Sequence, residues 1–192
     1  MNRSSMLLAA VALTCALLVG ARITAEQPPA AYLSVPAPPP GVDTAAATAP
    51  RIEEALGAVR LADLGGRPTS AVPRGQPTIV MINSRTCPWC KRSLADIGRL
   101  AGGAPLPRLT VLTLEGAAEG TPMLAREKIQ GARLIGPRDD AAQTALTFRV
   151  QGTPTFFAVD RNGRVARTLP GYPMEEELKH WLAVMRGTAS LP

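Results

Sequence analysis

The stretch that organises the sequence is Thr86-Cys87-Pro88-Trp89-Cys90-Lys91-Arg92. An unbroken apolar run over 78–82 precedes it and predicts a buried strand. After it, apolar residues recur at helical spacing over 94–100 and a Gly-Gly pair then stops the helix. Cys87 is therefore expected where a strand turns into a helix, with Pro88 at the first helical position.

This position has chemical consequences for the two cysteines. Unpaired backbone N–H groups and the positive end of the helix dipole favour a thiolate over a thiol at Cys87. Nearby basic residues add positive charge, with one acidic residue opposing them: Arg85, Lys91 and Arg92 against Asp96. Cys87 and Cys90 are spaced so that a small disulfide ring can close and reopen. The pattern predicts a redox-active dithiol.

The cysteine pair has two other interpretations. A zinc site needs two more ligands, and the only further Cys and His residues are Cys15, in an apolar N-terminal segment, and His180, near the other end. A purely structural disulfide would close a very short loop and gain little stability. Both are weaker than the redox interpretation, which requires no cofactor and no metal.

The N-terminal 50 residues differ from the rest. Residues 1–25 contain a basic start at Arg3 and an apolar stretch over 6–21, which predicts an export signal or a membrane anchor. Cleavage and retention both remain open, but either places residues 51–192 outside the cytoplasm, in the periplasm or its equivalent, where disulfides form. Residues 26–50 hold seven prolines and seven alanines and predict an extended linker.

Charge excludes one class of partner. The chain has a net charge of +6, but residues 26–192 carry 19 basic and 15 acidic side chains, interspersed and without a basic block. Nucleic-acid binding is therefore not indicated.

The remaining sequence predicts an α/β domain. The expected β elements are a hairpin over 59–69 and strands over 109–114, 133–135, 156–159 and 164–169, the last two joined by an Asn162-Gly163 turn. The expected helices run from a Thr121 cap to about 130 and from Asp139 or Asp140 to Phe148, and a last helix follows. Two helices carry apolar stripes that predict their buried sides: Ala142, Leu146 and Phe148, and then Met174, Leu178, Trp181, Leu182 and Met185.

With a strand, the CPWC motif, a helix, a downstream Gly152-Thr153-Pro154 and an Asn-Gly hairpin in order, the chain resembles the thioredoxin superfamily. More narrowly, it resembles the exported TlpA-like thiol-disulfide oxidoreductases. The resemblance covers about residues 51–187. It implies a mixed central sheet flanked by helices, with an N-terminal β-hairpin and a central strand–helix insertion.

The resemblance also implies roles for individual residues. Cys87 would attack a partner disulfide and Cys90 would resolve the mixed disulfide. Pro154 would follow a cis peptide bond and place the Thr153 backbone to pair with an extended substrate, with Trp89 on the rim. The buried aspartate of thioredoxin is replaced by Met81, so water or a carboxylate such as Glu115 would accept the proton of Cys90.

These observations predict a monomeric thiol-disulfide oxidoreductase that acts on protein thiols and disulfides. The TlpA-like resemblance implies that it acts as a reductase supplied by an upstream electron donor. The active-site residues themselves leave the direction open, because cationic neighbours stabilise the reduced thiolate and favour oxidising behaviour. A membrane tether is compatible with it. The first alternative is a dithiol oxidase or isomerase. An alternative of another class is a copper chaperone that uses Cys87 and Cys90 as soft Cu(I) ligands. A non-catalytic tethered binding module is the third.

Overall fold

The computed structural model describes residues 49–189 and residue 191. The predicted export signal or anchor (1–25) and all but the last two residues of the predicted linker (26–50) lie outside these described residues. Within the described part, no helix combines the length and the hydrophobicity needed to cross a bilayer.

One seven-stranded mixed sheet forms the centre of the domain, in the order β2-β1-β5-β4-β3-β6-β7. The inner strands β3, β4 and β5 are parallel, and β6 runs antiparallel to β3. The strands are β1 (Leu61–Asp63), β2 (Pro68–Thr69), β3 (Thr78–Asn83), β4 (Leu109–Thr113), β5 (Arg133–Pro137), β6 (Thr155–Val159) and β7 (Val165–Pro170). The helices are α3 (Ile52–Ala55), α4 (Pro88–Ala101), the 3-10 turn η2 (Ala117–Glu119), α5 (Gly120–Arg126), α6 (Asp140–Arg149) and α7 (Glu175–Arg186).

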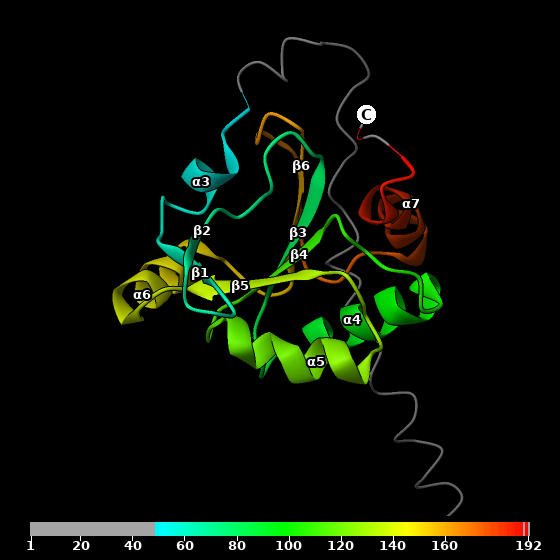
Figure 1. Ribbon diagram of the computed structural model, residues 1–192, viewed down its shortest axis with the longest axis horizontal. Coiled ribbons are helices and arrows are strands. Elements are labelled where there is room, and N and C mark those ends of the chain that lie inside the picture. The colour runs from blue at the N-terminus through cyan, green and yellow to red at the C-terminus, as the bar shows by residue number, and fades with distance from the viewer. Residues whose placement is uncertain (1–48, 190, 192) are drawn as a thin grey trace, which may run out of the picture. The chain divides into compact units, whose positions relative to one another are not determined.

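Helices cover both faces of the sheet (Figure 1). Side chains of α4, α5 and α7 form one core with alternate residues of β3 and β4, such as Met81 and Val111. Side chains of α3 and α6 form the other core with the residues that point the opposite way, such as Val80 and Leu112. Because β3 and β4 are buried on both faces, each is a continuous apolar or β-branched run rather than an alternating one. The expected fold, with its N-terminal hairpin and central strand–helix insertion, is confirmed.

Several local predictions are confirmed by capping and turn geometry. Cys87 is the N-cap of α4 and Pro88 is its first residue. The Asp139 side chain caps α6 by accepting a hydrogen bond from the Ala142 amide. The loop between β6 and β7 turns through Gly163 at φ +80°, a conformation that favours glycine.

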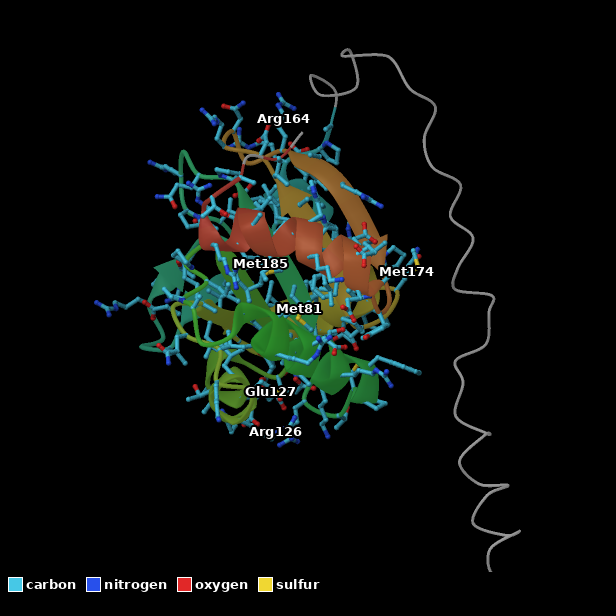
Figure 2. All side chains as sticks on the ribbon, turned by 90° about the vertical axis from the view of Figure 1, so that its right-hand side faces the viewer. Met81, Arg126, Glu127, Arg164, Met174 and Met185 are labelled. Atoms are coloured by element: carbon cyan, nitrogen blue, oxygen red, sulfur yellow. The ribbon has the colours of Figure 1, made fainter. Side chains whose placement is uncertain are left out.

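Three expectations about helix ends are wrong. Thr121 is not a cap, because η2 leads directly into α5 and places Thr121 inside the helix, which already ends at Arg126. Phe148 is 87% exposed and Met174 is 61% exposed, although both continue apolar stripes. Each lies at or beside a helix terminus, where the packed neighbour no longer extends, and Figure 2 shows Met174 at the periphery while Met81 lies inside.

The rest of the terminal stripe is buried as predicted. Trp181 is 1% exposed and packs on Phe156 of β6 with 5.4 Å between ring centroids. Leu178, Leu182 and Met185 are buried beside it. His180 is exposed. Helix α7 is thereby fixed to the centre of the sheet, on the same face as α4.

Helix α4 also approaches α5 closely at Gly98. A Cβ atom at this position would lie 2.2 Å from the carbonyl oxygen of Glu127. That contact involves backbone, so it cannot be relieved by a side-chain rotation. Gly98 therefore sets the distance between α4 and the segment that follows α5.

We predict that Gly98→Ala destabilises the protein. Alanine is ordinarily favoured over glycine inside a helix by about 1 kcal/mol, but overpacking here should cost about 1–3 kcal/mol in net unfolding free energy. Urea unfolding measures the change. The matched control is Gly152→Ala, where the added Cβ meets no atom within 4 Å, so its effect should stay within about 0.5 kcal/mol. Equal stability of the two variants would show that the helices separate without cost.

Candidate active site

The two cysteines lie at the start of α4, directly beyond the carboxyl end of β3. The Cys87 amide donates to the Ser84 carbonyl at 3.2 Å, which turns the chain between strand and helix. The Cys90 amide donates to the Cys87 sulfur at 3.0 Å. A backbone donor is thus aimed at the sulfur expected to attack, as the position at the helix start predicts. Both residues are free thiols.

The two sulfurs differ in their access to solvent. Cys87 is 9% exposed and Cys90 is fully buried. Burial raises the pKa of Cys90 to about 12, and its hydrogen bond with Cys87 adds to the rise. The Ser84 amide and the Thr153 side chain act against this by lowering the pKa of Cys90. A raised pKa means that the neutral thiol is the favoured form of Cys90 throughout the neutral range.

Thr153 lies against Cys87, and Pro154 follows it directly before β6. The Cys87 thiol donates to the Thr153 carbonyl at 3.2 Å across 66 positions of sequence. The Thr153–Pro154 peptide bond is cis. The Thr155 hydroxyl donates to the Gly152 carbonyl at 2.7 Å and holds the loop in place. The structure therefore brings together Cys87, Cys90, Thr153 and Pro154.

Trp89 lies at the rim of this site and is 36% exposed. Its indole ring faces Tyr172, with 6.0 Å between ring centroids and 49° between planes. The Tyr172 hydroxyl donates to Asp96 of α4, and burial, followed by this hydrogen bond, raises the pKa of Tyr172. The neighbouring Gly171 amide donates to the Pro154 carbonyl at 2.7 Å. The 170–174 loop is thus joined to both α4 and Pro154.

No sequence pattern assigned a role to this loop, because Gly171 and Tyr172 simply follow the strand expected over 164–169. One signal was present: Tyr172 is one of two tyrosines in an aromatic-poor chain, and prolines follow and precede its Gly-Tyr pair. An aromatic residue in such a turn indicates a fixed surface position rather than a core position.

The acidic residues near the site are arranged differently from the prediction. Glu115 accepts hydrogen bonds from the Ser84 hydroxyl at 2.6 Å and the Arg85 amide at 3.1 Å, so it holds the lead-in to Cys87 rather than bonding Cys90. Arg85 forms an ion pair with Glu119 at 3.5 Å. The expectation that only Asp96 opposes the local basic residues is therefore wrong, since folding brings two glutamates from the segment after β4.

Met81, at the position where thioredoxin has a buried aspartate, has apolar surroundings. Met81 is fully buried in the core beneath α4, and Figure 2 shows it in the interior. Among the residues at 49–189 and 191, no group of three or more His, Cys, Asp or Glu side chains is placed to hold a metal ion.

We predict that limiting iodoacetamide at neutral pH labels Cys87 before Cys90 in the reduced protein. Iodoacetamide reacts with the thiolate form of cysteine. The raised pKa of Cys90 keeps it in the thiol form, and its burial keeps the reagent away. Peptide mapping by mass spectrometry measures the two sites. Labelling of Cys90 should rise only as the pH approaches its pKa of about 12. Earlier labelling of Cys90 would contradict the assignment of Cys87 as the attacking residue.

Comparison with known proteins places this geometry in a family. Three solved structures are among those similar to this chain. StoA from Bacillus subtilis has 20% sequence identity and a TM-score of 0.47, with 64% of this chain and 93% of that chain covered. A thio-disulfide isomerase from Thermus thermophilus has 23% identity and a TM-score of 0.46, with 65% and 90% covered, and a secreted Mycobacterium tuberculosis disulfide oxidoreductase homologous to E. coli DsbE has 16% identity and a TM-score of 0.47, with 68% and 98% covered. No curated protein matched the sequence significantly. The family model of a thioredoxin-like domain matches residues 68–186, from β2 to the end of α7. The chain belongs to the thioredoxin-like family.

Proposed function

We propose that the protein is an exported thiol-disulfide oxidoreductase that exchanges its Cys87–Cys90 dithiol with disulfides of partner proteins. The observation that carries the proposal is the convergence of a Cys-Pro-Trp-Cys helix start and a Thr-Pro loop on one sulfur. Cys87 accepts from the Cys90 amide and donates to the Thr153 carbonyl. Membership of the thioredoxin-like family supports the same chemistry.

The reaction proceeds in two exchanges. The Cys87 thiolate attacks one sulfur of the partner disulfide, the partner S–S bond breaks, and the released partner thiolate takes a proton. Cys90 then gives its proton to water and attacks the Cys87 sulfur, which closes the Cys87–Cys90 disulfide and releases the second partner thiolate, and this thiolate takes up a proton from water. Two electrons and two protons have moved from the dithiol to the partner.

The partner segment would lie along the Thr153 loop. The Thr153 amide has no hydrogen-bond acceptor within the part of the chain that the structure describes, so it is available to an extended backbone. Trp89 provides exposed apolar surface beside it. Thr153, Pro154 and Trp89 are accordingly assigned to substrate binding.

We propose that the reaction runs as a reduction of the partner. Strong dithiol oxidants owe their behaviour to a stabilised reduced form, commonly a thiolate held by nearby positive charge. Here no basic side chain among the described residues hydrogen-bonds either sulfur, and Arg85 pairs with Glu119 instead. Burial also disfavours a thiolate at Cys90. An upstream donor would then restore the dithiol.

The predicted direction is tested by equilibrating the purified protein with reduced and oxidised glutathione and counting free thiols by alkylation. We expect a potential well below that of the glutathione pool, because no basic side chain among the described residues hydrogen-bonds either sulfur and burial disfavours a thiolate at Cys90. A difference of about 30 mV corresponds to about 1.4 kcal/mol for this couple. A potential near that of a strong oxidant would assign the protein as a dithiol oxidase.

We predict that Cys90→Ala accumulates partner proteins as mixed disulfides, whereas Cys87→Ala does not. Without Cys90 the mixed disulfide has no internal route to release. Non-reducing gels of extracts from cells expressing each variant show the adducts, and dithiothreitol should abolish them. Adducts formed equally by both variants would mean that the two cysteines do not have distinct roles.

A further inference from the structure

The rim beside Cys87 is a rigid aromatic surface. Trp89 and Tyr172 face one another at 6.0 Å, the Tyr172 hydroxyl is bonded to Asp96, and the Gly171 amide is bonded to the Pro154 carbonyl at 2.7 Å. Three separate segments of sequence are thus joined into one surface. A partner that places its disulfide over Cys87 must also lie against this pair of rings.

The carboxylates around the rim are already engaged. Glu119 pairs with Arg85 at 3.5 Å, and Glu115 accepts from the Ser84 hydroxyl and the Arg85 amide. Asp96 accepts from Tyr172 and from Arg99 at 3.1 Å. Glu119 and Asp96 therefore each have a basic partner within the protein, while Glu115 is held by two neutral donors.

Two basic residues near the start of α4 have no such partner. Lys91 and Arg92 are both exposed, and neither has a carboxylate within ion-pair distance in the described part of the chain. The Arg92 guanidinium lies over the Tyr172 ring, 5.5 Å from its centroid, which fixes one charge beside the aromatic pair. The positive end of the α4 dipole adds to the same field.

We propose that the redox partner presents an acidic segment to this surface: an extended stretch in which Asp or Glu residues flank the disulfide cysteine and an apolar residue covers Trp89 and Tyr172. The inference rests on the proposed function and specifies its substrate class. Complementary charge acts mainly on the rate of encounter and on the choice among partners, so acidic partners are selected by how fast they react.

The test uses three synthetic peptides of equal length with a mixed disulfide, whose cysteine is flanked by Asp and Glu, by Ser, or by Lys. Stopped-flow thiol release by the reduced protein gives a second-order rate constant for each. We expect the acidic peptide to react about tenfold faster than the Lys peptide at low ionic strength, with the difference shrinking as salt screens the charges.

Charge reversal locates the effect on the protein. The double variant Lys91→Glu with Arg92→Glu should invert the order of the acidic and Lys peptides. The control variant is Arg74→Glu with Arg161→Glu, which changes the net charge by the same amount. Both residues lie in loops at the end of β3 and β6 that is opposite to the cysteines. In Figure 2, Arg164 marks the β6–β7 turn at this end, away from Met174. It should keep the original order.

An uncharged disulfide distinguishes failure of the acidic-partner inference from failure of the proposed function. If the protein reduces hydroxyethyl disulfide but reacts equally with the acidic and Lys peptides, the acidic-partner inference is wrong and the proposed function stands. If the control variant inverts the order as strongly as the α4 variant does, net charge rather than this surface is responsible, and the inference is again wrong. If hydroxyethyl disulfide and all peptides are left oxidised, the proposed function fails together with the inference.

Discussion

The antiparallel pairing of β3 with β6 is the constraint on which the site depends. It sets Ile82 opposite Thr155, and thereby places the residues just after β3 beside those just before β6. Cys87 and Thr153 meet across this junction although 66 positions separate them. Neither segment forms a site by itself: the helix start supplies the sulfurs, and the Thr-Pro loop supplies the carbonyl and the open amide beside them.

Burial on both faces of the sheet explains why this junction is rigid. Alternate residues of β3 belong to different cores, with Met81 packed under α4 and Val80 packed on the other side. Helix α7 closes the first core through Trp181 against Phe156 of β6. The two strands that carry the site are thus fixed by the most deeply buried side chains of the domain, and displacement of either would open a cavity in a core.

The sequence predicted the start of α4 because its signals are local, whereas Thr153, Pro154 and Trp89 were expected only from the family resemblance. An apolar run, a Pro after the first cysteine and an Asn-Gly turn each act within a few residues. What it could not predict is set by contacts between distant segments. Glu115 and Glu119 reach the lead-in to Cys87 only after β4 pairs with β3, and Tyr172, in the loop after β7, acquires its role from Asp96 of α4. The exposed Phe148 and Met174 show the same limit, since an apolar stripe does not indicate where its packing partner ends.

The two tryptophans of the chain lie in opposite surroundings, and this gives the protein two separable optical signals. Trp181 is 1% exposed and packs on Phe156, so its emission should respond to loss of the core. Trp89 is 36% exposed, lies between the two cysteines in sequence and faces Tyr172. A soluble quencher should therefore reduce the emission of Trp89 and leave the emission of Trp181 unchanged. Fluorescence of the native, unlabelled chain therefore distinguishes events at the rim from unfolding of the domain, within one sample.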